Sequence, residues 1–143
     1  MLSSPAAEAA AVVFLLDVDN TLLDNDRFGA DLGATLEAAF GAGERERYWA
    51  IYEALRRESG VADYLGALQR FRAGLDNDPS LLQMSAYLLE YPFADRLYPH
   101  ALETVAHLRT LGPTAILSDG DVVFQPRKIQ RAGLWAALRG EVL

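Results

Sequence analysis

The sequence predicts an α/β protein in which a block of helices interrupts a parallel sheet. Two short apolar runs, 11–16 and 114–117, end abruptly in polar residues, as buried strands of parallel sheets do. The long segment between these runs shows helical spacing of its apolar residues. Beyond Leu97 the pattern is helix, strand, helix and further strand, which is typical of consecutive parallel strands.

The chain opens with the first strand, which we predict over 11–16, and with a loop over 17–26. The strand consists of small, β-branched and other apolar residues, and it stops at the first aspartate of the sequence. Loops at the carboxyl ends of strands bind ligands in open α/β sheets, so this loop is the first place to look for function.

The segment 28–90 has helical periodicity and no convincing strand. Glycines and one aspartate–proline pair divide it into four predicted helices, over 28–40, 44–58, 62–73 and 79–91. Asp78 and Pro79 are a typical helix start, with aspartate as the cap and proline in the first turn. The apolar residues of this fourth helix include Leu82 and Leu88. Together the four helices form a small module inserted after the first strand.

The last third of the chain returns to alternating helices and strands. Pro99 opens a helix that ends before Gly112, and 114–117 forms the second strand. A further helix follows and is interrupted by Gly133, and 140–143 looks like the opening of a third strand.

Composition limits the classes of function. The 143 residues fit one compact domain, or a small core with an insertion, and the net charge of -7 argues against non-specific binding to nucleic acid or anionic membrane. The absence of cysteine excludes disulfides, thiol catalysis and zinc–thiolate sites. A basic signal-peptide start and a membrane-length apolar run are both lacking, so we expect a cytoplasmic protein.

Polar clusters follow both predicted strands. Asp17 and Asp19 come after the first strand, Ser118 and Asp119 come after the second, and the single lysine of the chain, Lys128, lies ten residues later. Adjacent parallel strands present these ends at the same edge of a sheet, where two carboxylates need a cation or a proton to offset their repulsion. A polar turn with capping side chains is the plain structural alternative.

These residues resemble the motifs of the haloacid dehalogenase-like hydrolase superfamily. The segment DVDNTL matches the Asp-x-Asp-x-Thr motif, Ser118 sits like the serine or threonine of the second motif, and Lys128 sits like the third-motif lysine. The helical module looks like the helical cap of the family. The resemblance thus implies a partial Rossmann-like parallel core over 10–24 and 95–143, with the cap over 25–94.

The resemblance also implies a mechanism for the two aspartates. Asp17 would attack phosphorus and form an aspartyl-phosphate, while Asp19 would protonate the leaving oxygen and then activate water. A Mg²⁺ ion would be held by the Asp17 carboxylate, the backbone carbonyl of Asp19 and the phosphate.

The remaining motif residues would bind the phosphate and support the loop. The resemblance assigns Ser118 and the backbone N–H groups of Asp119 and Gly120 to the phosphoryl oxygens. It assigns Thr21 to holding the loop, and Lys128 to supplying positive charge to the attacking aspartate and the transferred group.

One departure from the family pattern concerns the C-terminus. The fourth family motif supplies further acidic metal ligands after the lysine, but only fifteen residues follow Lys128, and Glu141 is the sole acid among them. We therefore expect a chain truncated relative to the family, with weakened Mg²⁺ binding. We also expect an open apolar strand edge that could pair with another chain in a homodimer.

Several functions remain open on the sequence alone. A Mg²⁺-dependent phosphohydrolase acting on a small phosphorylated metabolite is the leading hypothesis. A phosphomutase, or a dehalogenase in which Asp17 attacks carbon without a metal, would use the same fold. A truncated relative acting only through assembly is the non-catalytic alternative, and a phosphoacceptor receiver domain fits the strand order less well.

Some residues near the motifs allow two interpretations. We predict that Asp121 caps the following helix, although it could be an additional acid of the site. The aromatic residues Tyr48, Trp49 and Tyr52 are predicted to form the core of the cap, with a ring facing the substrate as the alternative. The segment 26–28 either starts a helix or contacts the substrate.

Overall fold

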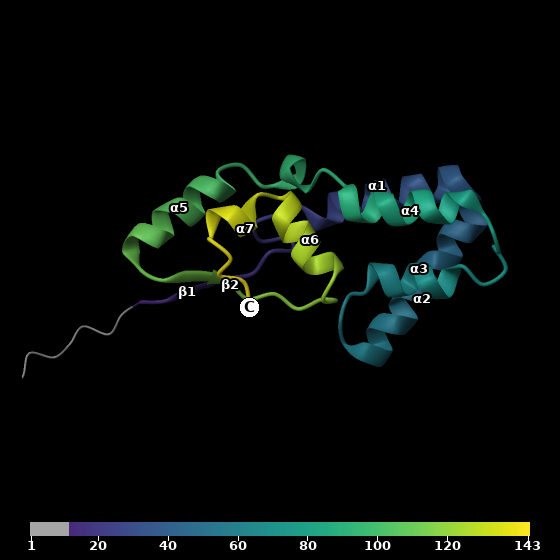
Figure 1. The fold of residues 1–143 in the computed structure, drawn as a ribbon, viewed down its shortest axis with the longest axis horizontal. Helices are drawn as coiled ribbons and strands as arrows, with labels where there is room; N and C mark the ends of the chain where they lie inside the picture. The colour runs from purple at the N-terminus through teal and green to yellow at the C-terminus, as the bar shows by residue number, and fades with distance from the viewer. Residues whose placement is uncertain (1–11) are drawn as a thin grey trace, which may run out of the picture.

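The structure, a computed structural model, describes residues 12–143. Residues 10 and 11, where the predicted core and first strand begin, lie outside the described residues. The predicted α/β class is confirmed. In Figure 1 the two strands lie with helices α5 and α7 at one end of the molecule, helices α1–α4 lie at the other end, and α6 lies between them.

The sheet is parallel, as predicted. Strand β1 (Phe14–Leu16) pairs with β2 (Thr114–Ile116), with Phe14 beside Thr114 and Leu16 beside Ile116. The predicted third strand over 140–143 is reduced to one parallel bridge between Ile116 and Val142. It is short because Gly140 has a left-handed φ of 84° and its carbonyl accepts a hydrogen bond from the Val142 N–H, so a turn occupies the start of the segment.

The four helices predicted between the strands are all present. They form what we call the four-helix block, which consists of α1 (Asn25–Phe40), α2 (Ala42–Ser59), α3 (Tyr64–Phe71) and α4 (Pro79–Glu90). Helix α1 begins earlier than predicted, because the Asp24 carboxylate caps it by accepting the Arg27 N–H at 2.9 Å. Asp78 caps α4 as predicted.

The remaining helices return the chain to the sheet. They are the 3₁₀ turn η1 (Phe93–Arg96), which the sequence did not predict, and α5 (Ala101–Leu111), α6 (Phe124–Arg131) and α7 (Leu134–Ala137). Gly133 separates α6 from α7 with a left-handed φ of 82°, so the predicted interruption is confirmed. None of the described helices has both the length and the apolar character that crossing a membrane requires.

Aromatic rings join the four-helix block to the part of the chain around the sheet. The four-ring cluster consists of Phe28 from α1, Tyr64 from α3, Phe93 from η1 and Phe124 from α6. The Phe28 ring lies 5.0 Å from Phe93 and 5.7 Å from Phe124, and the Tyr64 ring lies 4.9 Å from Phe124. Such edge and tilted pairs add to the free energy gained by burying the rings.

The prediction for the apolar side of α4 was partly wrong. Leu88 is fully buried, but the Leu82 side chain is 75% exposed. Leu82 lies in the first turn of α4 and lines a surface cavity with Leu68 and Gln69 of α3.

The strand β1 has a partner on one side only within residues 12–143. Its backbone is paired with β2 alone among the described residues. Val13, directly before the strand, and Leu15 are 58% and 54% exposed. This arrangement agrees with the expectation of an open apolar edge.

The close approach of two chain segments at the start of the strands gives a test of the fold. A Cβ added at Gly112 would lie 2.2 Å from the backbone oxygen of Val12, although the extended backbone at this glycine suits any residue. We expect Gly112→Ala to lower the free energy of unfolding by about 1–3 kcal/mol, because the entry to β1 must move. Urea denaturation followed by circular dichroism measures this loss.

Gly29 provides a matched control on helix α1. A Cβ at this position meets nothing within 4 Å. We expect Gly29→Ala to raise the free energy of unfolding by about 0.5–1 kcal/mol, since alanine loses less conformational entropy in a helix. Equal stability of Gly112→Ala and the unmodified chain would contradict the close contact between Gly112 and the Val12 backbone oxygen.

Candidate functional site

The loop after β1 is held by one buried backbone carbonyl. The N–H groups of Thr21, Leu22 and Leu23 all donate to the Val18 oxygen, at 3.2, 2.9 and 3.1 Å, and the Val18 side chain is fully buried. With Val18 directed into the core, its neighbours Asp17 and Asp19 carry their carboxylates toward a cavity.

The first predicted catalytic residue, Asp17, is exposed and hydrogen-bonded to Thr21. The Thr21 hydroxyl donates to Oδ2 of Asp17 at 2.7 Å. The structure therefore places Thr21 where it can orient the Asp17 carboxylate directly. This is a more specific contact than the general support of the loop that was predicted for Thr21.

Asn20 is a residue of this loop that the sequence reasoning missed. Its φ of 57° is left-handed, a conformation that asparagine tolerates better than most residues. Its side-chain oxygen accepts the N–H groups of Asn25 and Asp26, and its amide donates to the Asp26 carboxylate. Asn20 thereby ties the loop to the first turn of α1. The segment 26–28 is accordingly a helix start, with Phe28 buried in the four-ring cluster.

Lys128 is fully buried, which rules out a solvated surface lysine. Its Nζ donates to Oδ1 of Asp19 at 2.7 Å and to Oδ1 of Asn25 at 2.8 Å. The resemblance implied that Lys128 supplies positive charge to Asp17. The structure pairs the ammonium directly with Asp19, and the charge of Asp17 acts on it more weakly.

The four rings surround the ammonium group. Its nitrogen lies 5.4–5.9 Å from the centroids of all four rings of the cluster. Ring faces attract cations, and this attraction grows where water is excluded. Burial nevertheless lowers the pKa of Lys128, while the negative charge of Asp19 and, more weakly, those of Asp121 and Asp17 oppose that lowering.

A hydrogen-bond network connects Lys128 to the four-helix block. Asn25, the first residue of α1, accepts from Lys128 and donates to the Tyr64 hydroxyl at 3.4 Å. The sequence reasoning missed Asn25, although its place eight residues after Asp17 puts it at the end of the catalytic loop. The environment of the lysine therefore depends on the first turn of α1 and on α3.

The cluster after β2 is organised by Gln125, another residue that the sequence reasoning missed. Its amide donates to the Ser118 hydroxyl at 2.8 Å and to Oδ2 of Asp19 at 3.4 Å, so it links the ends of the two strands. A Cβ at Gly120 would lie 2.9 Å from the Cβ of Gln125, so a larger residue at position 120 would collide with it. The loop of Ser118 thus packs directly against α6.

Asp121 caps helix α6, as predicted. Its Oδ1 accepts the N–H groups of Val123 and Phe124 at 2.9 and 2.7 Å. Its other oxygen, Oδ2, is buried and has no hydrogen-bond partner among the described residues.

Five of the seven predicted site residues line two cavities, and Thr21 and Lys128 line neither of them. One cavity, of about 240 Å³, is lined by Asp17, Asp19 and Asp119, and its other residues come from the end of α2 and the turn after it. These other residues are Tyr52, Arg56, Gly60 and Ala62. The second cavity, of about 230 Å³, includes Ser118 and Gly120 among its lining residues.

The aromatic residues of α2 are divided between the core of the four-helix block and the lining of the cavity of the aspartates. Tyr48 is fully buried, and its hydroxyl donates to the Tyr64 carbonyl, so it belongs to the core of the four-helix block. The Tyr52 ring stacks on the Tyr64 ring at 4.8 Å and also lines the cavity of the aspartates. Arg56, one turn further along α2, was not singled out from the sequence.

The acidic residues offer oxygen ligands to a cation. Within residues 12–143 no three or more His, Cys, Asp or Glu side chains are grouped so as to hold a metal ion. Mg²⁺ is usually bound by only one or two carboxylates, with phosphate and water completing the shell. The chemistry of Asp17 and Asp19, which supply oxygen donors only, is therefore compatible with Mg²⁺ held together with a substrate phosphate.

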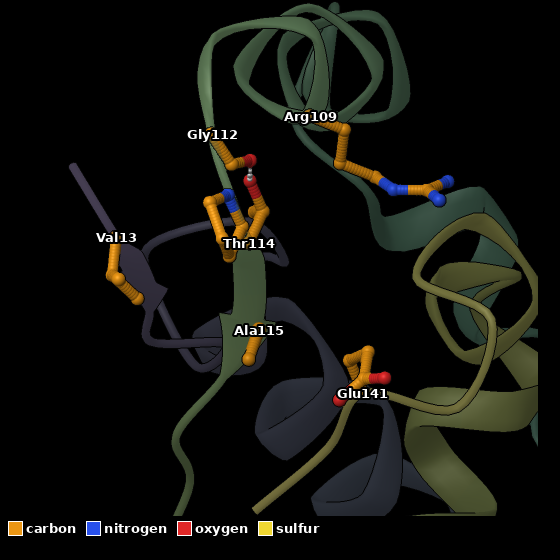
Figure 2. A pocket seen from close by; sticks show the side chains of 7 residues that line it. Val13, Arg109, Gly112, Thr114, Ala115 and Glu141 are labelled. Atoms are coloured by element: carbon orange, nitrogen blue, oxygen red, sulfur yellow. Dashed lines mark hydrogen bonds between the residues drawn. The ribbon is translucent and has the colours of Figure 1, made fainter. Parts of the chain in front are cut away.

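Glu141 pairs through its backbone with the end of β2, but it lines a cavity at the start of the strands, away from the loop of Asp17. It lines a cavity of about 370 Å³ together with Val13, Arg109, Gly112 and Thr114, at the start of the strands (Figure 2). Its backbone oxygen accepts the Ile116 N–H. The sole acid after Lys128 is thus not placed to complete a metal site at Asp17.

The sequence profile of the haloacid dehalogenase-like hydrolases matches residues 12–141. The chain belongs to this family. The predicted family is therefore confirmed, over nearly the whole chain. A comparison with curated proteins gives no match.

Solved structures agree with this assignment. A structure from Burkholderia xenovorans LB400, assigned by its name to the haloacid dehalogenase-like hydrolases, is 60% identical, with a TM-score of 0.84 over 92% of this chain. This chain covers 61% of the length of that protein.

Two more distant structures show the fold alone. L-2-haloacid dehalogenase from Xanthobacter autotrophicus is 21% identical with a TM-score of 0.53, over 87% of this chain and 53% of its own. YfnB from Bacillus subtilis, bound to magnesium, is 16% identical with a TM-score of 0.53, over 90% of this chain and 63% of its own. The family member described here thus spans less than two thirds of each of these three relatives.

The buried lysine makes stability depend on pH in a predictable direction. Because the pKa of Lys128 is lower in the folded chain than its ordinary 10.5, the unfolded chain binds more protons between the two values. The contribution of Lys128 to the free energy of unfolding should therefore increase as the pH rises from its folded pKa toward 10.5. Urea denaturation of the unmodified chain and of Lys128→Met across this range measures the difference.

The variant Lys128→Met should lack that increase and should be no less stable than the unmodified chain at neutral pH. Methionine fills the apolar route among the rings, and Asp19, whose side chain is 31% exposed, remains hydrated. Asp19→Asn is the matched control, and it should lower stability because the buried ammonium loses its counter-charge. A large loss of stability in Lys128→Met, with no change in its pH dependence, would contradict this description.

Proposed function

We propose that this family member hydrolyses a small phosphate monoester with the help of Mg²⁺, through an aspartyl-phosphate formed on Asp17. The observation that carries the proposal is the division of labour between the two aspartates. Asp17 is exposed at the cavity and accepts a hydrogen bond from Thr21, while Asp19 accepts hydrogen bonds from Lys128 and Gln125.

In the proposed reaction, Asp17 is the nucleophile. The Thr21 hydroxyl binds Oδ2, which leaves Oδ1 as the oxygen that forms the bond to phosphorus. The bond between phosphorus and the leaving oxygen breaks, and Asp19, which must enter this step in its protonated form, gives its proton to that oxygen and becomes a carboxylate paired with Lys128. In the second step Asp19 takes a proton from water, which attacks phosphorus and releases Asp17 and inorganic phosphate.

The remaining residues support the charge of the phosphoryl group. Ser118 and the backbone N–H groups of Asp119 and Gly120 follow β2 at the same edge of the sheet as Asp17, where they can donate to phosphoryl oxygens. When bound, Mg²⁺ would be held by the Asp17 carboxylate and the Asp19 carbonyl, and it would neutralise charge on the phosphate. The magnesium-bound structure of YfnB, which shares this fold, supports this choice of ion.

Dehalogenation is the second candidate reaction. In it Asp17 would attack a carbon that carries a halogen, without a metal. Two observations favour it, namely the lack of a three-acid metal group among the described residues and the fold shared with L-2-haloacid dehalogenase.

Hydrolysis of phenyl phosphate tests the proposed reaction. We expect turnover that requires Mg²⁺ and is abolished by EDTA, and we expect Asp17→Asn to reduce kcat/KM by roughly a thousandfold or more. Asp76→Asn, which alters an exposed aspartate outside the site, should retain full activity and serves as the control.

Two results would overturn the phosphohydrolase proposal. Metal-dependent turnover that survives Asp17→Asn would exclude Asp17 as the nucleophile. Release of chloride from 2-chloropropionate without metal, combined with no release of phosphate from phenyl phosphate, would favour the dehalogenase.

We also propose that the open edge of β1 pairs with a second copy of the chain. The exposed Val13 and Leu15 side chains and the unpaired side of this strand support the proposal. Sedimentation velocity at micromolar concentration should then show a dimer, and Leu15→Lys should shift it toward the monomer because charged residues disfavour edge pairing. A monomer at all concentrations would refute the pairing.

A further inference from the structure

We propose that the substrate carries a carboxylate in addition to its phosphate, and that Arg56 binds this carboxylate. The inference rests on the proposed function, because it takes the phosphate to react at Asp17. It identifies the class of substrate as small phosphorylated carboxylic acids and makes Arg56 the residue that selects them.

The position of Arg56 is the first argument. The cavity of the aspartates is lined by Asp17, Asp19 and Asp119 and by the end of α2, where Arg56 lies. Arg56 is the only cationic residue among those that line this cavity. A substrate whose phosphate lies at Asp17 would therefore direct its other end toward a guanidinium group.

The local structure at the end of α2 holds Arg56 at the cavity. The N–H of Gly60 donates to the Arg56 carbonyl at 2.8 Å and ends the helix with a left-handed residue, φ 77°. The chain then turns, so that Gly60 and Ala62 line the same cavity. A helix C-terminus also favours a cation, so a positive charge is stable at this position without an acidic partner.

Arg56 is free to bind a ligand. It is exposed, and the ion pairs within residues 12–143 do not include it. Its neighbour Arg57 is likewise exposed and absent from these ion pairs, so the position at the cavity of the aspartates is what distinguishes Arg56.

Arg56 and Tyr52 lie one helical turn apart and line the same cavity. Burial raises the pKa of the Tyr52 hydroxyl, and a hydrogen bond with Tyr64 and the positive charge of Arg56 oppose part of this increase. The charge of Arg56 is therefore felt by another residue of the cavity lining.

The chemistry and the size of the cavity favour a small carboxylate. Guanidinium binds carboxylate with two parallel hydrogen bonds, a geometry that provides both affinity and orientation. The volume of about 240 Å³ is below the range of roughly 300–1,000 Å³ that is usual for larger ligands. Only a short linker then fits between the phosphate and the carboxylate.

The test compares two substrates that differ only in charge, 2-carboxyethyl phosphate and its neutral amide, 2-carbamoylethyl phosphate. We expect the unmodified chain to prefer the carboxylate by about 10- to 100-fold in kcat/KM, which is the range of a charge-assisted pair. In Arg56→Gln the ratio of the two kcat/KM values should fall toward one. Arg57→Gln, the adjacent exposed arginine of α2, should keep the preference and is the matched control.

Binding provides a readout that does not require turnover. Isothermal titration calorimetry in the presence of Mg²⁺ uses 4-phosphonobutanoate, the non-hydrolysable analogue of 2-carboxyethyl phosphate, and its amide. Arg56→Gln should weaken binding of 4-phosphonobutanoate about tenfold more than binding of the amide. Equal weakening of both, or no binding of 4-phosphonobutanoate to the unmodified chain, would overturn the inference.

The two sets of measurements separate the inference from the proposed function. Turnover of phenyl phosphate without any preference for the carboxylate would overturn the role of Arg56 and leave the phosphohydrolase intact. Arg56-dependent binding of 4-phosphonobutanoate, with no release of phosphate from any ester, would support the carboxylate site and overturn the proposed reaction.

Discussion

The buried ammonium group of Lys128 is the constraint on which the arrangement of the site depends. A charge removed from water is tolerated only when it is paired and fully hydrogen-bonded. Here the partners are the Asp19 carboxylate and the Asn25 side-chain oxygen, and the stem of the lysine is surrounded by the four-ring cluster. If Asp19 moved away, the ammonium would be left buried without its counter-charge, so these groups are held together as one unit.

This unit joins parts of the chain that are far apart in sequence. Asp19 comes from the loop after β1, Asn25 begins α1, and Lys128 lies on α6 after the second strand. Because the aromatic rings around the lysine come from α1, α3, η1 and α6, the four-helix block and the sheet share one core at this point. The block therefore contributes directly to the surroundings of Asp19 and Lys128 and, through Tyr52 and Arg56, to the lining of the cavity.

Much of the site could be predicted from the sequence, because short motifs at strand ends are local. The identities of Asp17, Asp19, Ser118 and Lys128 followed from residue type and order, and the four helices followed from periodicity and caps. The partner of Lys128 could not be predicted, because it depends on how a long side chain passes between rings from four elements. The place of Arg56 could not be predicted either, since twelve arginines are present and only packing brings this one to the cavity.

The anchoring of the loop at Val18 has a thermodynamic consequence. Three backbone donors converge on one buried carbonyl, so the loop holds Asp17 and Asp19 at the cavity before any ligand is bound. The conformational cost of bringing these carboxylates to the cavity is then part of the cost of folding and is not incurred again when a ligand binds. A sequence change that loosened this turn would lower both the stability of the chain and the affinity of the site for a ligand.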